Sequence, residues 1–284
     1  MRCRNSWHIT VISLLALVSA ASAEPRRVIS TFLCTDEYVY RLVPRDHIAA
    51  LSFLAADRHP VVSTIVDKVA GIPLVHDSAE EVLSLHPDAV VMYAGTQERL
   101  HAQLRAAGIS IIDAGWSNSL ADIRRDALTL GRALGEEQRA RALVAGMDDK
   151  LAIAKAPGAP LRTLIYQPNG YASSGPVTEE ILARAGLVDV AAEMGMTRSG
   201  EIPVELVVAD PPQLLLLSAA DPRTSLATLE LHHPALQTLS GRTAIAAISL
   251  TPLACPGPWS ADVLRPLLAA ADEARQLARR HSGP

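Results

Sequence analysis

The sequence predicts an α/β protein made of two lobes that are joined by one long helix. Short apolar segments alternate with amphipathic helical segments along the chain, which is typical of α/β proteins. This alternation stops at one long helical stretch over residues 136–156 and restarts after it. A glutamate-to-proline pattern also occurs once on each side of that stretch, at residues 80–91 and 205–216.

The first 23 residues have the three parts of a secretory signal peptide. Arg2 and Arg4 give a basic start, residues 9–20 form an apolar run, and Ala21-Ser22-Ala23 forms a small-residue cleavage site. The apolar run is shorter than the roughly 20 residues that a membrane-spanning helix needs. No cysteine stands at the cleavage site to carry a lipid anchor. We therefore expect export to the periplasm, with cleavage after Ala23.

The composition of the remaining chain argues against two classes of partner. Without the signal peptide, 24 basic residues face 30 acidic ones. The basic residues form no stripe, which argues against nucleic-acid binding. No second long apolar run follows the signal peptide, so we expect a protein that is not inserted in the membrane. We also expect a monomer.

We assign residues 24–135 to an N-terminal α/β lobe. A helix at residues 96–107 ends at Gly108, a residue type suited to a C-terminal cap. A longer helix begins at Ser119, which opens a capping box, and is interrupted at Gly135. The buried strands of this lobe are expected at residues 27–32, 48–53, 88–93 and 109–113.

Residues 136–157 are the connecting helix, and residues 158–284 form a C-terminal α/β lobe. About 21 helical residues at 1.5 Å each give a length of about 30 Å, the width of a small domain. Pro157-Gly158-Ala159-Pro160 ends this helix. The second lobe is expected to contain strands at residues 161–166, 213–218 and 243–250, and helices at residues 178–186 and 259–280.

Two corresponding segments favour duplicated lobes. Residues 80–91 read EEVLSLHPDAVV, and residues 205–216 read ELVVADPPQLLL. In both, a glutamate stands seven residues before a proline, and an apolar run follows. A proline ends a helix, and a short apolar run predicts a buried strand. The alternative is that proline is common between a helix and a strand, so that each pattern arises on its own.

Taken in order, these segments resemble the class III periplasmic binding proteins, which serve importers of vitamin B12, haem and ferric siderophores. The resemblance covers nearly the whole mature chain and is closest in layout to the vitamin B12-binding members. The segments that carry it are RRVISTF at 26–32, SAEEVLSLHPDAVVMY at 78–93, QERLHAQLRAAGISIIDAG at 97–115, LADIRRDALTLGRALGEEQRARAL at 120–143, TLIYQPNGYASSGPVTEEILARAGLVDVA at 163–191 and VELVVADPPQLLLLS at 204–218.

The resemblance implies two Rossmann-like lobes, a single long rigid helix between them and a ligand cleft between the lobes. It further implies capture of a metal chelate, a corrinoid or a ferric siderophore, for an ABC permease dimer with its ATPase. The metal, Co or Fe, would belong to the ligand, and no intrinsic cofactor is expected. The stretch before Glu80 reads GIPLVHDS. It lacks the Trp of vitamin B12-binding members and the Tyr of haem-binding members, and His76 is the residue there that could replace them.

Two other classes of function stay open beside this one. A chaperone or sensor that binds haem or another ligand could use the same fold, because a fold does not fix a function. An enzyme is disfavoured, since the sequence has no nucleophile elbow, Gly-rich phosphate loop or His-Glu metal motif. The histidines have no spacing typical of a zinc site, so we expect no metal site of the protein's own.

Four aromatic residues are expected to wall the ligand site. In α/β layers, ligands bind at the loops beyond the carboxyl ends of the strands. Such loops are expected here at residues 33–36, 54–59, 93–96, 115–118, 167–174 and 251–260. They hold Tyr93, Trp116, Tyr171 and Trp259, and aromatic walls suit a large planar ligand. Ordinary packing beneath the loops is the alternative for each of the four.

Cys34 and Cys255 are the only cysteines of the mature chain. We expect both to face the cleft, one from each lobe, as ligand-binding residues. In an oxidising compartment such a pair is first interpreted as a disulfide, which would tie the lobes together across the ligand site. Two free thiols beside the ligand, or two thiolates that bind a soft metal, are the alternatives. The geometry of the pair decides between them.

Glu80 and Glu205 are predicted in the first turns of corresponding helices, one on each lobe. Ser78 can cap the first helix, and Pro203 suits the first position of the second. Acids at helix starts are favoured by the helix dipole by about 0.3–1 kcal/mol without any partner. In the family that the chain resembles, the matching glutamates form salt bridges with arginines of the permease. We therefore hypothesise that Glu80 and Glu205 dock the permease.

Overall fold

The computed structural model describes residues 24–58, 62–153, 158–218, 231, 233–239 and 241–281. The predicted signal peptide and its cleavage site lie outside the described residues, as does the expected end of the connecting helix at residues 154–157. None of the helices in the described part of the chain combines the length and the apolar character needed to cross a membrane.

The N-terminal lobe is built on a five-stranded parallel sheet. Its strand order is β3-β2-β1-β4-β5. The chain therefore builds outward from β1 in one direction, returns, and builds outward in the other, which is the arrangement of doubly wound α/β folds. The strands are β1 (Val28–Ser30), β2 (Ile48–Ser52), β3 (Leu74–Val75), β4 (Ala89–Tyr93) and β5 (Ser110–Ala114).

Helices cover both faces of this sheet, because its strands carry apolar side chains on alternate sides. Val28 and Val91 pack with the first pair of helices, α1 (Leu33–Leu42) and α4 (Leu120–Leu134). Ile29, Val90 and Met92 point the other way and pack with α2 (Ala79–Ser84) and α3 (Glu98–Ala106). Two short 3-10 helices, η1 (Arg45–His47) and η2 (Phe53–Ala56), flank β2.

The C-terminal lobe has a six-stranded mixed sheet with the order β11-β10-β6-β7-β9, and β8 pairs with β6. β6, β8, β10 and β11 run parallel, β7 is antiparallel to β6, and β9 is antiparallel to β7. The strands are β6 (Leu161–Gln167), β7 (Tyr171–Ala172), β8 (Leu187–Asp189), β9 (Gly200–Glu201), β10 (Leu214–Ser218) and β11 (Ala244–Ile248). Its helices are η3 (Pro168–Gly170), α6 (Pro176–Arg184), α7 (Val190–Glu193), α8 (Val204–Ala209), α9 (Pro234–Gln237), α10 (Thr251–Ala254), η5 (Pro258–Val263) and α11 (Leu264–His281).

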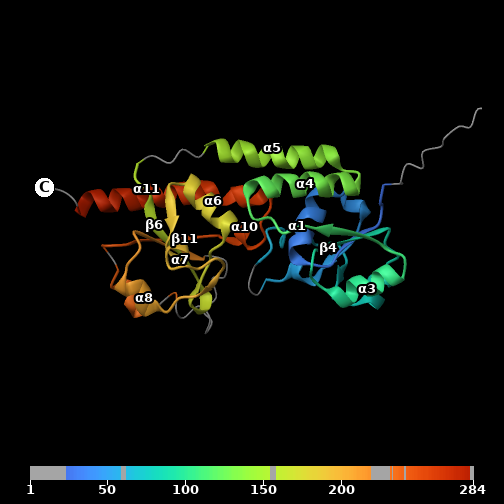
Figure 1. Cartoon of the computed structure of the whole chain (residues 1–284), viewed down its shortest axis with the longest axis horizontal. Helices are drawn as coiled ribbons and strands as arrows, with labels where there is room; N and C mark the ends of the chain where they lie inside the picture. Colours follow the sequence, from blue (N-terminus) through green and yellow to red (C-terminus); the bar gives the residue numbers. More distant parts are fainter. Residues whose placement is uncertain are drawn as a thin grey trace, which may run out of the picture.

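Two antiparallel helices bridge the lobes. The predicted connecting helix is α5 (Glu137–Ile153), in which Ala140 packs in the N-terminal core while Met147 lies in the C-terminal core. α4 crosses in the opposite direction, with Ile123 in the C-terminal core and Leu130 in the N-terminal core. Figure 1 shows α4, α5 and α11 along one long side of the molecule, with α3 and α8 on the opposite side. The sequence predicted one crossing helix, and the structure adds a second.

The helix boundaries follow the local signals that predicted them. The Ser119 hydroxyl accepts the backbone N–H of Asp122 at 3.0 Å, and the Ser78 hydroxyl caps α2 in the same way. Gly108 and Gly135 take positive φ values of 75° and 77° at helix ends, where glycine is favoured.

Two of the segments that were expected as loops contain α-helix. Residues 33–36 form the first turn of α1, because Cys34, Tyr38 and Leu42 recur at helical spacing and bury one face of the segment. Residues 251–260 contain α10 and the start of η5. Both segments therefore pack against the body of the protein more closely than a surface loop does.

Candidate functional site

The carboxyl end of every strand in the N-terminal sheet carries an aromatic side chain. Phe32 follows β1, Phe53 follows β2, His76 follows β3, Tyr93 ends β4, and Trp116 lies two residues past β5. The strand order places them in the sequence His76, Phe53, Phe32, Tyr93, Trp116 across the sheet. We call these five side chains the aromatic row. Neighbouring strands lie about 4.8 Å apart, so the row follows the whole edge of the sheet.

Ring contacts join the row into two groups. The rings of Phe32 and Tyr93 are stacked, with centroids 5.4 Å apart and planes inclined by 15°. Trp116 meets Tyr93 edge-on, at 4.2 Å and 79°. On the other side, Phe53 stacks on His76 at 4.9 Å and 21°. Phe53 is 42% exposed and Trp116 is 57% exposed, so each group presents an aromatic surface to solvent.

The Phe32–Tyr93 pair stands at the topological switch point of the sheet. β1 and β4 are neighbours in the sheet, and the chain winds away from them in opposite directions. In open α/β sheets, ligands bind outside the carboxyl ends of the strands at such a point. The centre of the aromatic row therefore coincides with the position at which this fold binds ligands.

Polar contacts hold Trp116 and the residue that follows it in place. The Trp116 indole donates to the carbonyl oxygen of Ala94 at 2.7 Å. Beneath it, the Ser117 hydroxyl donates to the Asp126 carboxylate at 2.8 Å. Burial, together with the negative charge of Asp126, raises the pKa of Tyr93 to about 12. Tyr93 is therefore a neutral phenol at physiological pH. Its side chain is only 2% exposed, so it supports the exposed Trp116 ring from below and presents little surface of its own.

A surface pocket of about 580 Å³ adjoins the Trp116 end of the row. Ala94, whose carbonyl oxygen holds Trp116, forms part of its wall. His101 and Arg105 line it together with Asp113, and a His101 ring nitrogen lies 3.3 Å from the Asp113 carboxylate. The pocket could accept a polar substituent of a ligand that rests on the row.

A helix of the C-terminal lobe contacts the chain shortly after Trp116. α4 begins four residues after Trp116, and there the Leu120 N–H donates to the Glu180 carboxylate of α6 at 3.1 Å. The predicted ligand residue Tyr171 starts β7 and is 45% exposed. It follows Asn169 and Gly170, which both have positive φ values. Among the described residues, no ring contact joins Tyr171 to the aromatic row.

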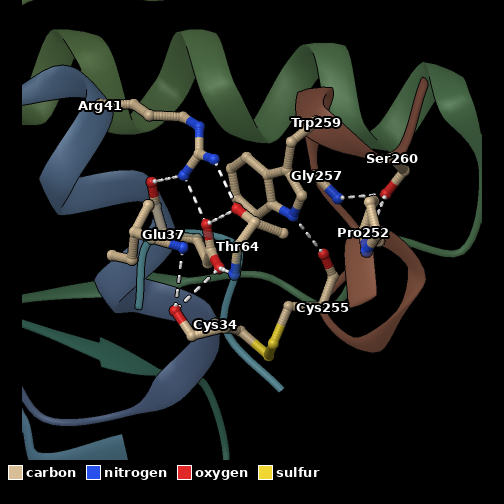
Figure 2. A network of polar contacts seen from close by, with 11 residues as sticks. Cys34, Glu37, Arg41, Thr64, Pro252, Cys255, Gly257, Trp259 and Ser260 are labelled. Carbon is tan, nitrogen blue, oxygen red and sulfur yellow. Dashed lines mark hydrogen bonds and ion pairs between the residues drawn. A yellow bond between two sulfur atoms is a disulfide. The ribbon is translucent and has the colours of Figure 1, made fainter. Parts of the chain in front are cut away.

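Cys34 and Cys255 form a disulfide, with Cα atoms 5.1 Å apart. Of the interpretations that the sequence left open, the structure contains the disulfide, which excludes free thiols and thiolate metal ligands at this place. The two cysteines are 8% and 2% exposed, and Trp259 is 2% exposed. All three were predicted to contact the ligand. The structure instead places them in the packing between the lobes, where Trp259 donates to the Cys255 carbonyl at 2.8 Å (Figure 2).

A buried ion pair supports this packing. The Glu37 side chain is 1% exposed, and its carboxylate accepts from Arg41 at 2.5 Å. Glu37 also accepts the Thr64 hydroxyl at 2.6 Å, and Arg41 donates to the same hydroxyl at 2.6 Å. The guanidinium carbon of Arg41 lies 4.6 Å from the centroid of the Trp259 ring (Figure 2). Because two of its nitrogens donate to Glu37 and Thr64 within the N-terminal lobe, Arg41 forms a fixed surface for Trp259.

The predicted docking residues lie apart from this site. Glu80 and Glu205 are exposed in the first turns of α2 and α8. α2 packs with α3 in one core cluster, and both α3 and α8 lie on the side away from α4 and α5 (Figure 1). Glu80 also lines a surface pocket of about 480 Å³ together with Asp77 and Glu98. The structure thus places one glutamate on the same side of each lobe.

Phe32 and Phe53 were not predicted from the sequence as site residues. His76 was singled out, but its stacking on Phe53 was not foreseen. One signal was available, because the chain has only two phenylalanines and each is the last residue of a predicted strand. Across residues 24–58, 62–153 and the rest of the described chain, no three His, Cys, Asp or Glu side chains are grouped to hold a metal ion.

A family model described as "Periplasmic binding protein" matches residues 36–239. A curated relative from Bacillus subtilis (strain 168), the uncharacterized ABC transporter substrate-binding lipoprotein YvrC, is 26% identical over 131 residues. That alignment covers 45% of this chain and 40% of the relative, so it spans about two fifths of the relative's length.

Solved structures share the fold at low sequence identity. The periplasmic heme-binding protein RhuT from Roseiflexus sp. RS-1 in apo form has a TM-score of 0.65 at 21% identity, covering 88% of this chain and 98% of that one. The periplasmic vitamin B12 binding protein BtuF of Vibrio cholerae has a TM-score of 0.64 at 18% identity, covering 89% and 98%. The periplasmic heme binding protein HutB of Vibrio cholerae has a TM-score of 0.69 at 17% identity, covering 86% and 97%.

Proposed function

This chain belongs to the periplasmic binding protein family, whose members bind solutes and are not enzymes, and on that premise we propose that it is the substrate-binding component of an ABC importer. The substrate is a metal chelate, a corrinoid or a ferric siderophore, with haem as the alternative. Its metal, Co or Fe, arrives within the ligand.

The aromatic row at the switch point is the observation that carries the ligand proposal. Trp116 and Phe53 expose large aromatic surfaces beside the stacked pair of Phe32 and Tyr93. Exposed aromatic surface gathered at a binding edge favours a ligand with a large flat or apolar face. The descriptions of the similar structures, which name heme and vitamin B12, support the same class of ligand. We propose Tyr171, which is exposed at the start of β7 in the second lobe, as the opposite wall of the ligand site.

Titration with three probes tests this proposal. We expect the mature protein to bind one molecule of haemin, cyanocobalamin or a ferric hydroxamate chelate, seen as a change in the absorption spectrum of the probe and as a native mass. Trp116→Ala should weaken that binding by at least about tenfold, or about 1.4 kcal/mol, because a large exposed aromatic contact is lost. Ile153→Ala, which truncates a side chain of similar exposure at the end of α5, should leave the affinity unchanged. Affinity for a sugar or an amino acid, with none for the three probes, would overturn the ligand assignment.

The protein acts in the periplasm after removal of residues 1–23. The basic start, the apolar run and Ala21-Ser22-Ala23 support export. A disulfide of the kind formed by Cys34 and Cys255 persists in oxidising compartments, which supports the same location. N-terminal sequencing of the exported protein should begin at Glu24. Recovery of the intact N-terminus from the membrane fraction would contradict it.

The two sheets support the proposed division into an N-terminal lobe at residues 24–135, a connecting helix at 136–157 and a C-terminal lobe at 158–284. In this arrangement each lobe supplies one docking glutamate to a permease dimer with its ATPase, while the binding protein itself is a monomer. The exposed positions of Glu80 and Glu205 on one side of the molecule support simultaneous contact with two subunits.

Charge reversal tests the docking role. Glu80→Arg with Glu205→Arg should abolish uptake of the bound chelate, because arginines would then face the basic side chains of the permease. Ligand affinity and unfolding should stay at the wild-type level. Asp149→Arg with Glu273→Arg makes the same change in net charge at exposed positions on α5 and α11 and should preserve uptake. Wild-type uptake by the first pair would contradict the docking role and leave only a helix-start role for the two glutamates. Absence of uptake by the wild type itself would favour a chaperone or sensor function instead.

A further inference from the structure

A short segment of the C-terminal lobe crosses into the N-terminal lobe and returns. Leu250 packs in the core of the C-terminal lobe, whereas Cys255 and Trp259 pack in the core of the N-terminal lobe. Val263 again belongs to the C-terminal core. We call residues Cys255–Ser260 the interlobe strap. Its crossing is separate from those of α4 and α5.

Three contacts fasten the interlobe strap to α1. Cys255 is bonded to Cys34. The Trp259 ring meets Tyr38 edge-on, with centroids 4.8 Å apart, and its face lies against the Arg41 guanidinium at 4.6 Å. The three partners follow the i, i+4, i+7 spacing of one helix face. α1 therefore presents a covalent, an aromatic and a cationic anchor side by side.

The interlobe strap is also braced within itself. The Trp259 indole donates to the Cys255 carbonyl, and the Ser260 hydroxyl accepts the Gly257 N–H at 3.1 Å and donates to the Pro252 carbonyl at 3.0 Å (Figure 2). A Cβ at Gly257 would stand 2.3 Å from a ring carbon of Trp259. The close approach of backbone and ring fixes the position of Trp259 relative to the disulfide.

The disulfide lies on the far side of Trp259 from the bridging helices. Figure 2 shows a helix above Trp259 and the sulfur atoms of Cys34 and Cys255 below it. If the lobes opened about α4 and α5, the separation would grow with distance from these helices. Such a movement would pull Cys34 away from Cys255, which the covalent bond prevents. Cys34 stands two residues after Phe32, so this restraint is applied beside the aromatic row.

We infer that the interlobe strap sets the separation of the two lobes at the ligand-binding edge, as a restraint separate from that of the bridging helices. Cys34, Cys255 and Trp259 act as positioning residues, because they hold the two walls and do not touch the ligand themselves. Hinge closure needs a few residues that absorb the movement, and a second tether away from the bridging helices removes that freedom. The inference rests on the proposed function for the place of the ligand, but the lobe separation is measurable without any ligand.

Distances between spin labels test the inference directly. Gln103→Cys on α3 and Leu206→Cys on α8 place one exposed label site on each lobe, on helices away from α4 and α5 (Figure 1). The native cysteines are bonded to each other and do not react with the label. With the disulfide present, we expect one narrow distance distribution. With Cys34→Ser and Cys255→Ser added, we expect a broader distribution shifted to longer distances.

Two further variants keep the result decisive. Val90→Ala weakens the N-terminal core away from the interlobe strap and should keep the narrow distribution, which separates lobe opening from general loss of stability. If the serine pair fails to fold, Cys34→Ala with Cys255→Val replaces the disulfide by apolar groups suited to its buried site. Identical distributions with and without the disulfide would overturn the inference.

Ligand measurements separate this inference from the proposed function. Haemin, cyanocobalamin and the ferric hydroxamate chelate are added to the labelled protein, and the probe that binds should leave the narrow distribution of the wild type unshifted. The same probe should dissociate faster from the protein without the disulfide, because its two walls are no longer held together. If none of the probes binds, the ligand proposal fails while the label distances still decide the role of the interlobe strap.

Discussion

Asp36 makes the stability of this protein depend on pH in a way that a single substitution should remove. The side chain is fully buried in the first turn of α1. One carboxyl oxygen accepts the Ser52 N–H at 2.9 Å, and the other lies 2.5 Å from the Ser52 hydroxyl. Burial raises the pKa of Asp36 to about 8, the hydrogen bonds from Ser30 and Ser52 oppose this, and the neighbouring Glu37 adds to it.

The sign and size of the effect follow from the two protonation states. The pKa of Asp36 rises from 3.8 to about 8 on folding, so between these values the folded state holds a proton that the unfolded state has released. The contribution of Asp36 to stability is therefore fully present below pH 3.8, falls as the pH rises and is lost once the pH has passed about 8. The loss is at most about 1.4 kcal/mol per pH unit, which amounts to about 3–4 kcal/mol between pH 5 and pH 8.

Asp36→Asn should remove this dependence while preserving the hydrogen bonds. The amide oxygen can accept the Ser52 N–H, and the amide N–H can donate to the Ser52 hydroxyl, as a protonated carboxyl group does. Urea unfolding of both proteins at pH 5, 6, 7 and 8 gives the two free energies of unfolding. The difference between them should shift in favour of the Asp36→Asn variant by about 3–4 kcal/mol across this range.

Thr243→Val serves as the control for the Asp36 experiment, because it removes a buried hydrogen bond to the Pro212 carbonyl in the other lobe without removing a titratable group or a neighbour of Asp36. Its effect on the free energy of unfolding should be the same at every pH. A constant difference between the wild type and Asp36→Asn from pH 5 to pH 8 would refute the reasoning, since it would mean that Asp36 is charged in the folded state throughout.

Three further predictions follow from the packing. Gly131→Ala should lower the free energy of unfolding in urea by about 1–3 kcal/mol, because the new Cβ would stand 2.3 Å from that of Ala140, where α4 packs on α5. Gly146→Ala is the control, since no atom lies within 4 Å of its Cβ. It should raise the free energy of unfolding by about 0.5–1 kcal/mol. Gly257→Ala should displace Trp259, seen as a red shift of tryptophan emission and a loss of about 1–3 kcal/mol. The mature protein unfolded without reductant should show no titratable thiol, and two thiols per chain would contradict the disulfide.

Most of the fold could be predicted because its signals are local. β4 occupies residues 89–93 and β6 residues 161–167, close to the apolar runs that predicted them. Ser119 and Gly135 bound α4 as expected, since a cap depends only on residues within one helical turn. β3, β7 and β9 have two residues each and were missed, because a strand of two residues has no periodicity. The crossing of α4 between the lobes was also missed, because its apolar stripe does not reveal which core each residue joins.

The ligand site was predicted in part, for a physical reason that differs from residue to residue. Tyr93 and Trp116 were placed at the edge of the sheet from their positions after strands, and the structure puts their rings in contact. Phe32 was missed although it ends the first predicted strand, because only the residues after it were expected to form the loop. The order of the row depends on which strands are neighbours, and that order is set by pairing between distant segments.

Trp259 illustrates the opposite error and its cause. A tryptophan after a strand, flanked by proline, glycine and serine, has the local signature of an exposed loop. Its side chain is nevertheless buried, because the segment from Cys255 crosses into the other lobe and finds Tyr38 and Arg41 on α1. Only the partner lobe supplies the apolar and cationic surface that covers the ring. An aromatic residue in a loop between lobes can therefore be assigned to the ligand site or to the core only when the structures of both lobes are known. The same holds for Cys34, whose bonding partner lies 221 residues away.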